Sequence, residues 1–328
     1  MKKAAIIFLS LLLSLTLILF IPGCAPPEEP GNNDNNNNNE VTPDPDTITL
    51  TLYFKDLTLE DYDPQDYGLV VPVEREIPHR EDVARAALEE LIKGPQEDEG
   101  EVGPVIRDDA QIIDVFMEDS TCVVDISHEF PIMEVGGAEE GAVFMESVIY
   151  TLTEFEEIDT VWVFREGLCW EDGHIAWGGP LKRPQEPQRI NLYFCDVEAA
   201  ATGEEGEFGY VTPVEREVPW TPGLLWETVR QLNEGPQEER GPSNEDLART
   251  LPENTEILSV PCPTLEDRTV TVNLRNSITT GTLEGMIFRQ SLVYTMTEFP
   301  LVDKVVVQEE GEPWDDGHWI WDEPVRQP

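Results

Sequence analysis

The sequence predicts an α+β fold made of two tandem copies of one small domain. First, a long segment repeats: YGLVVPVEREIP at 67–78 returns as FGYVTPVEREVP at 208–219. Second, each copy alternates short strand-like runs with two helical patterns. Third, each helical pattern carries an apolar stripe that a sheet can cover. A chain of 328 residues also has the length expected for two domains.

The repeat extends over nearly the whole chain after residue 46. Three more segment pairs recur in the same order: GPQE at 94–97 and 235–238, SVIYTLTEF at 147–155 and SLVYTMTEF at 291–299, and WEDGH at 170–174 and WDDGH at 314–318. We therefore expect a first domain at 47–183 and a second at 189–328. The linker between them, 184–188, is short and stiffened by two prolines.

Each copy is predicted to have a helix–strand–strand–helix–strand core, preceded by extended segments. In the first copy the predicted strands cover 48–54, 69–76, 111–117, 121–127 and 160–165, and the predicted helices cover 80–93 and 139–155. Pro72 indicates that the second strand is an edge strand or an irregular one, because proline lacks the N–H that an inner strand donates. Gly94 and Pro95 are expected to end the first helix. Helices packed on one face of a sheet would bury both apolar stripes.

The N-terminal segment is typical of an exported lipoprotein. Two lysines precede an apolar run at 4–21, and Gly23-Cys24 follows, which resembles a bacterial lipobox. We expect residues 1–23 to be a signal peptide and Cys24 to be acylated, which would anchor the protein outside the cytoplasm on the cell membrane. An uncleaved N-terminal helix is the alternative. Residues 24–46, rich in Pro, Asn and acids, are expected to form a flexible tether with a reach of roughly 25 Å.

The charge of the chain excludes one class of partner. It has 21 Lys and Arg against 67 Asp and Glu, a formal net charge of −46. Because nucleic acids are bound mainly through positive charge, the sequence predicts no nucleic-acid partner. The same charge opposes electrostatic binding to an anionic membrane surface, which leaves the lipid anchor as the expected membrane contact.

Four further cysteines lie at positions that differ between the two copies. An exported chain can form disulfides, and the candidates are Cys122, Cys169, Cys195 and Cys262. A bridge that each domain required would recur in both copies. The sequence therefore favours buried thiols over a structural disulfide.

The recurring Asp-Gly-His segments are the best candidates for chemistry. Asp172 with His174, and Asp316 with His318, are each two residues apart, so an extended chain would place both side chains on one face, where they could share a metal ion. Two ligands are fewer than zinc usually takes, and Asp-Gly is a turn signal, so we favour a turn clamped by the flanking tryptophans. We predict no catalytic residue, no metal and no cofactor.

Arginines repeat inside Glu-Arg-Glu, at Arg75 and Arg216. They could bind an anion, but with acids on both sides structural ion pairs or hydrogen bonds to a loop are the favoured interpretation. Tyr150 and Tyr294 with their neighbouring threonines are expected to serve core packing plus one hydroxyl hydrogen bond.

The repeated residues resemble the GerMN domain family of sporulation and germination proteins. The matching segments are LYF at 52–54 and 192–194, VERE at 73–76 and 214–217, the Gly-Pro pairs after the first helices, and YTLTEF at 150–155 with YTMTEF at 294–299. The resemblance implies a lipoprotein without known enzymatic activity. It also implies an αββαβ ring-building-motif fold, and, as partners, other envelope or sporulation-channel proteins, with self-assembly as a possibility.

The leading hypothesis is thus a non-enzymatic envelope lipoprotein that binds proteins during sporulation or germination. Two alternatives stay open: a cell-wall hydrolase with a metal at the Asp-Gly-His turns, and an accessory lipoprotein that modulates an envelope sensor kinase.

Overall fold

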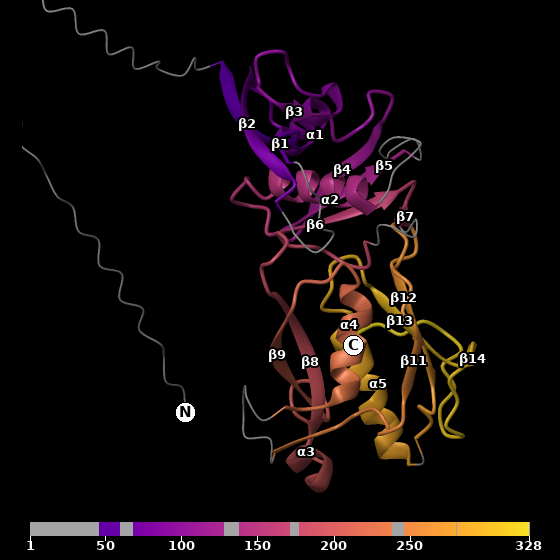
Figure 1. The fold of residues 1–328 in the computed structure, drawn as a ribbon. Coiled ribbons are helices and arrows are strands. Elements are labelled where there is room, and N and C mark those ends of the chain that lie inside the picture. Colours follow the sequence, from indigo (N-terminus) through magenta and orange to yellow (C-terminus); the bar gives the residue numbers. More distant parts are fainter. Residues whose placement is uncertain are drawn as a thin grey trace, which may run out of the picture. The chain divides into compact units, whose positions relative to one another are not determined.

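The computed structural model describes residues 46–59, 68–127, 138–170, 177–237, 246–279 and 281–327 (Figure 1). The predicted signal peptide, Cys24 and all of the predicted tether except residue 46 lie outside the described residues. Among the residues that are described, no helix is both long and apolar enough to cross a membrane.

The first copy consists of two sheets and two helices in its described part. Its elements in chain order are β1 (Thr47–Asp56), β2 (Val70–Pro78), α1 (Val83–Lys93), β3 (Val102–Gly103), β4 (Ile112–Glu118), β5 (Thr121–Ile126), α2 (Ala138–Leu152), β6 (Thr160–Arg165) and β7 (Leu168–Cys169). One sheet has the order β2-β1-β3 and the other β4-β5-β6-β7. β5 pairs with β4 antiparallel and with β6 parallel, and α2 connects β5 to β6. The predicted core order is confirmed as α1-β4-β5-α2-β6.

The second copy repeats this plan of strands and helices (Figure 1). Its elements are β8 (Gln188–Asp196), α3 (Val197–Thr202), β9 (Val211–Val218), α4 (Leu224–Glu234), β10 (Leu247–Ala248), β11 (Glu256–Ser259), β12 (Thr269–Arg275), α5 (Thr282–Met296), β13 (Lys304–Glu309) and β14 (Glu312–Pro313). The sheets are β10-β8-β9 and β11-β12-β13-β14, and β12 and β13 are parallel. The fold class is therefore α+β, with the same core in both copies.

The helices lie between two sheets, whereas the sequence led us to expect a single sheet with helices on one face. In the first copy α1 contacts β1 and β4, and α2 contacts β1 and β6. As a result α2 is buried almost all round. The helical spacing predicts an inward stripe of Ala142, Met145, Ile149, Leu152 and Phe155, but Val143, Phe144 and Val148, which lie outside that stripe, are as buried as Ile149 and Leu152. An apolar stripe marks a helix with one covered face, and a helix covered on two sides is apolar all round.

The boundaries of the helices differ from prediction at the start of α1 and at the end of α2, which ends at Leu152 instead of residue 155. Helix α1 begins at Val83 instead of Arg80, whose side chain binds the carboxylates of Asp82 and Glu89. Its end is as predicted: Gly94 follows it with a φ of 75°, a region that favours glycine. Pro72 also lies as predicted, because β2 is an edge strand.

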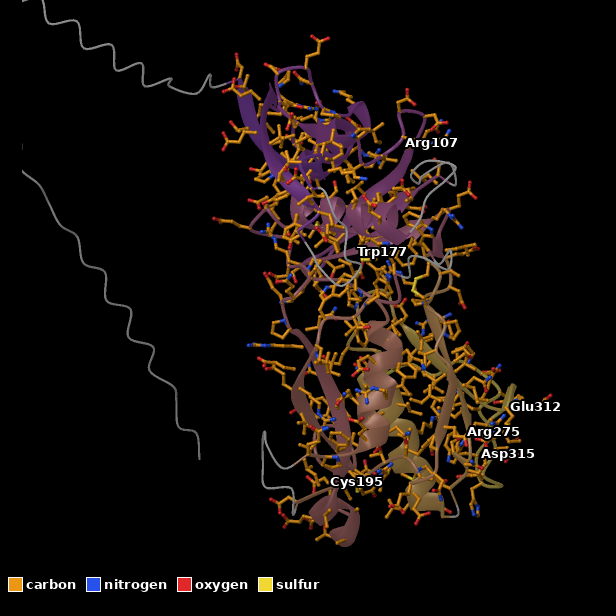
Figure 2. The ribbon with its side chains drawn as sticks, viewed as in Figure 1. Arg107, Trp177, Cys195, Arg275, Glu312 and Asp315 are labelled. Carbon is orange, nitrogen blue, oxygen red and sulfur yellow. A yellow bond between two sulfur atoms is a disulfide. The ribbon has the colours of Figure 1, made fainter. Side chains whose placement is uncertain are left out.

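The expectation that all four cysteines are thiols is wrong for two of them. Cys169 of β7 and Cys262, in the segment between β11 and β12, form a disulfide between residues 93 positions apart. The bridge joins the two copies to each other, so it has no reason to recur within each copy. Cys122 and Cys195 are buried thiols, and Figure 2 labels Cys195. Burial raises the pKa of Cys122 to about 12.

Candidate functional site

A strand–helix clamp, built from the most strongly repeated residues, ties β1 to α2. The Tyr53 N–H donates to the hydroxyl of Thr151 at 3.0 Å, and the hydroxyl of Ser147 donates to the Tyr53 carbonyl at 2.6 Å. The phenol of Tyr53 donates to Glu154 at 2.9 Å. Burial and this carboxylate together raise the pKa of the Tyr53 phenol. Ser147, Thr151 and Glu154 thus meet one tyrosine from one side of a helix.

The second copy contains the same clamp with the equivalent residues. Tyr193 N–H donates to Thr295 at 3.1 Å, Ser291 donates to the Tyr193 carbonyl at 2.6 Å, and the Tyr193 phenol donates to Glu298 at 2.5 Å. In both copies the tyrosine also stacks on a helix tyrosine, Tyr150 or Tyr294, with ring centroids 5.2 and 5.3 Å apart. The duplicated motif therefore has one duplicated structure.

The clamp supplies hydrogen-bond partners that the sheet does not. Tyr53 lies opposite Pro72 in β2, and Tyr193 lies opposite Pro213 in β9. At these positions the tyrosine peptide groups point away from the neighbouring strand, where buried N–H and C=O groups still need partners. Helix hydroxyls take that role. Core packing and one hydroxyl hydrogen bond were expected for Tyr150 and Tyr294 with their threonines, and Thr151 and Thr295 do form such bonds. The roles of the serines and of the strand tyrosines were missed, although S-x-x-x-T-x-x-E recurs in both copies.

Removal of one clamp hydroxyl is expected to destabilise the protein. Thr151→Val keeps the shape of the side chain but leaves the Tyr53 N–H without its acceptor, at a cost of about 1–3 kcal/mol in the free energy of unfolding. Thr282, exposed at the start of α5, provides the matched control. Urea unfolding would measure both variants, and equal stability of Thr151→Val and Thr282→Val would show that the clamp does not support the fold.

Arg75 is a buried structural residue at the end of α1. Its guanidinium binds Glu90 at 3.0 Å, Glu99 at 2.7 Å and the carbonyl of Gly94 at 3.0 Å. Burial, the largest influence, lowers the pKa of Arg75, but the bonds to the two carboxylates outweigh it and the pKa is raised. The favoured interpretation, a structural ion pair, is confirmed for this arginine.

Arg216 has the same place in the second copy with neutral partners among the described residues. It donates to the carbonyl and side-chain oxygens of Gln231 at 3.1 and 2.9 Å and to the carbonyl of Gly235 at 2.9 Å. Burial lowers its pKa. Both arginines therefore satisfy the carbonyl groups that a helix leaves free at its end.

The Asp-Gly-His segment of the second copy forms a turn. One carboxylate oxygen of Asp316 accepts the N–H groups of His318 at 2.9 Å and Trp319 at 2.7 Å, and the other accepts the Thr279 hydroxyl at 3.2 Å. Burial raises the pKa of Asp316, yet these hydrogen bonds outweigh it and leave the pKa below its usual value. The first-copy candidates Asp172 and His174 lie outside the described residues.

The flanking tryptophans fasten this turn to the domain. Trp314 is buried and stacks on Phe288 of α5 with ring centroids 4.8 Å apart. The imidazole of His318 is exposed beside the turn. Within the described ranges, no three His, Cys, Asp or Glu side chains come together in a way that could hold a metal ion.

The two turn residues are expected to differ when they are mutated. Asp316→Ala removes the acceptor of three donors and should lower the free energy of unfolding by about 1–2 kcal/mol, as for the loss of a helix cap. His318→Ala should change it by less than about 0.5 kcal/mol, because the side chain is exposed. Thermal unfolding with and without added Zn²⁺ tests this, and a Zn²⁺-dependent stabilisation that His318→Ala abolishes would instead indicate a metal site.

Comparisons with known proteins agree with the duplicated organisation. A family model described as "Germane: Sporulation and spore germination" matches residues 51–168 and again residues 191–315. No curated protein matches the chain.

Three solved structures are similar to parts of the chain. The tandem GerMN domains of the sporulation protein GerM from Bacillus subtilis are 22% identical, with 86% of this chain and 97% of that chain covered and a TM-score of 0.32. The first GerMN domain of that protein is 28% identical, with 37% and 84% covered and a TM-score of 0.30. A putative lipoprotein from Clostridium perfringens is 21% identical, with 42% and 87% covered and a TM-score of 0.28.

The segments that the family model matches contain both strand–helix clamps and both buried arginines, and they make up more than half of the chain. The chain therefore belongs to the Germane family of sporulation and spore germination proteins, with the family's GerMN domain present in two tandem copies.

Proposed function

We propose that this sporulation- or germination-related protein is a non-enzymatic envelope lipoprotein that binds other proteins through its two GerMN domains. The observation that carries the proposal is that the repeated polar side chains bind groups within the protein itself. The clamp residues, the buried arginines and Asp316 each form hydrogen bonds to backbone groups of their own domain. A repeated catalytic site would instead leave polar side chains directed at a substrate.

Exposed apolar side chains support a binding role. Trp226 on α4 is 43% exposed, and Trp319 and Ile320 are 44% and 54% exposed. Tryptophan is among the residues most enriched at the centres of protein interfaces, so these exposed side chains are available for contact with a partner.

The proposed mechanism combines the domains with the predicted anchor. Acylation at Cys24 would keep the domains at the cell membrane, and the tether would let them reach partners nearby. Confinement of this kind raises the effective concentration of each partner without any new contact. The proposed partners are other proteins of the envelope or of a sporulation channel.

The anchor is tested by Cys24→Ala in the host, with membrane fractionation and separate counts of spores formed and spores germinated. We expect the variant to leave the membrane fraction and to lose function. A control that carries Cys24→Ala behind an unrelated transmembrane segment should recover both. Full membrane attachment and full function of Cys24→Ala would contradict the proposal.

Partner binding is tested by crosslinking in sporulating cells, followed by purification of the protein. We expect envelope proteins to be crosslinked to the wild-type chain and to be absent when the same purification is made from a strain that lacks the protein. Cell-wall hydrolysis by the purified wild-type protein would contradict the non-enzymatic role.

A further inference from the structure

An arginine covers the end of α4 in the second copy. The guanidinium of Arg249 donates to the last two carbonyls of the helix, those of Asn233 and Glu234, at 2.5 and 3.4 Å. Its side chain lies against Gly235, because a Cβ atom added there would be 2.6 Å from the Cγ atom of Arg249. A cation at this place binds carbonyl groups that a helix leaves free and faces the negative end of the helix dipole.

The first copy has a proline in place of this arginine. β3 and β10 pair with equivalent positions of β1 and β8, and the residues that follow these two strands are Pro104 and Arg249. Their neighbours match as well: a Cβ atom added to Gly94 would contact Pro104, at 4.0 Å, as one added to Gly235 would contact Arg249. Proline has no side-chain donor, so Pro104 does not make the bonds that Arg249 makes.

The place of the missing guanidinium borders a groove in the first copy. The groove has a volume of about 930 Å³, and its lining includes Pro104 and the last two residues of α1, Ile92 and Lys93. In the part of the chain that the structure describes, no hydrogen-bond donor reaches the carbonyls of Ile92 and Lys93. Helix α1 therefore ends in free acceptors beside an open groove.

The cations that line the groove are already paired. Each of these three side chains has a carboxylate partner: Lys55 with Glu139 at 2.7 Å, Arg107 with Asp109 at 2.7 Å, and Lys93 with Glu90. Asp108 also lines the groove, is exposed and has no ion pair among the described residues. The groups that this lining offers to a ligand are thus a carboxylate and helix carbonyls, which bind a positively charged donor.

The rest of the lining is apolar and suits the stem of an arginine. Leu57 is 58% exposed, and Val105, Ile106 and Val143 also line the groove. An arginine packs its methylene groups on apolar surface while its charged end binds polar groups. The planar guanidinium presents several N–H donors in a fixed arrangement, so it can bind two neighbouring carbonyls at once, whereas a lysine ammonium is a point charge.

We infer that the groove at Ile92, Lys93 and Pro104 binds an arginine side chain from a basic partner protein. The inference rests on the proposed protein-binding function and names its surface and partner chemistry. The guanidinium of the partner takes the place that Arg249 fills in the second copy, and Asp108 adds negative charge to the same groove. A basic partner is also attracted by the formal net charge of −46.

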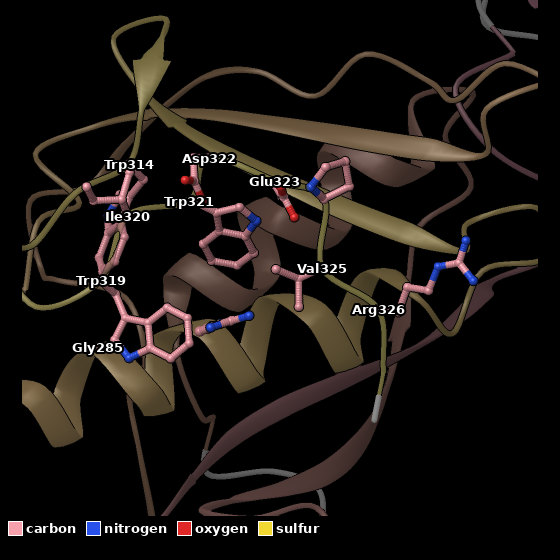
Figure 3. A pocket seen from close by; sticks show the side chains of 11 residues that line it. Gly285, Trp314, Trp319, Ile320, Trp321, Asp322, Glu323, Val325 and Arg326 are labelled. Atoms are coloured by element: carbon pink, nitrogen blue, oxygen red, sulfur yellow. The ribbon is translucent and has the colours of Figure 1, made fainter.

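A second copy of this chain is a poor occupant. Two chains that each carry a formal net charge of −46 repel each other. The chain does have an exposed arginine near its end, Arg326, which in Figure 3 lies at the far side of the pictured pocket from Trp319. The variant Arg326→Ala therefore tests this occupant directly.

Two labelled peptides test the groove on the full chain in detergent, at about 150 mM salt to screen long-range attraction. One is acetyl-Gly-Leu-Arg-Leu-Gly, and the other has citrulline, a neutral side chain of nearly the same shape, in place of arginine. By fluorescence anisotropy we expect saturable binding of the arginine peptide and at least about fivefold weaker binding of the citrulline peptide.

Two variants locate the binding. Pro104→Arg copies the second copy, fills the place from within and should weaken the arginine peptide at least about tenfold. The matched control, Pro78→Arg, adds the same charge at an exposed position opposite Thr47, at the other end of β1, and should keep the affinity within about twofold. No saturable binding, equal affinity of the two peptides, or unchanged affinity in the Pro104→Arg protein would overturn the inference.

Sedimentation and crosslinking separate the remaining outcomes. Self-association of the wild-type chain that both Arg326→Ala and Pro104→Arg abolish would show that a second copy is the occupant, which also overturns the inference. If envelope proteins crosslink to the Pro104→Arg chain in cells as they do to the wild type, this groove is excluded while the proposed function stands.

Discussion

Arg75→Met is expected to lower the free energy of unfolding by about 3–5 kcal/mol, the range found when one partner of a buried ion pair is removed. The guanidinium of Arg75 is 5% exposed and is the shared partner of Glu90 and Glu99. Without it two carboxylates face each other in a poorly hydrated place, and the carbonyl of Gly94 loses its donor. Urea unfolding followed by circular dichroism gives the change directly.

The second copy provides the control for this prediction. Arg216 makes the same bonds to a helix end, but its partner at the Glu90 position is the neutral Gln231. Arg216→Met should therefore cost less, about 1–3 kcal/mol, the range for unsatisfied neutral groups. A loss below about 1 kcal/mol for Arg75→Met, or equal losses for both variants, would contradict the assignment of a buried ion pair.

The loss in the free energy of unfolding caused by Arg75→Met should also depend on pH. Burial raises the pKa values of Glu90 and Glu99, but hydrogen bonds outweigh this effect. Lys93 and Arg75 donate to Glu90, and Arg75 also donates to Glu99. Both folded-state pKa values therefore lie below the usual 4.5. A lowered carboxyl pKa contributes stability above 4.5 that is lost as the pH falls through the folded value. The difference between wild type and Arg75→Met should thus shrink below about pH 4.5, and a constant difference from pH 7 to pH 3 would contradict it.

Loss of the disulfide is the second large effect that we expect. Cys169→Ser with Cys262→Ser should lower the free energy of unfolding by about 2–5 kcal/mol, because the bridge joins residues 93 positions apart and restricts the unfolded chain. The buried thiol Cys195 provides the control, since Cys195→Ala removes a sulfur without opening a bridge.

The same prediction can be checked without mutation. A reductant should shift the unfolding curve of the wild-type protein toward that of the double serine variant and leave the variant unchanged. An unfolding curve that reductant does not move would show that Cys169 and Cys262 are not joined in the protein.

The element order could be read from the sequence because it depends on local patterns. Alternation identifies β1, helical spacing identifies α2, and Gly94 marks the end of α1. The sequence did not show that the extended segments form a second sheet across the helices. That arrangement depends on which faces pack together, and α2 is buried on nearly all sides, including the side that carries Ser147 and Thr151.

The candidate sites were predictable only in part. The recurrence of Arg75 and Arg216 correctly pointed to structural bonds, whereas the roles of Ser147 and Thr151 depend on a strand about a hundred residues earlier. The disulfide was missed because recurrence in both copies is expected only of a bridge that lies within one copy. Cys169 and Cys262 lie on different copies, and only their contact in space identifies the pair.

The central claim is that the protein acts through its surfaces and that its repeated polar residues build the fold. The most direct measurement is complementation of a deletion strain with a His174→Ala, His318→Ala protein, scored for spore formation and germination, with the amount of folded protein measured in parallel. The account predicts wild-type spore counts and germination. Loss of either function while the folded protein is present at its normal amount would contradict it and would favour chemistry at the Asp-Gly-His turns.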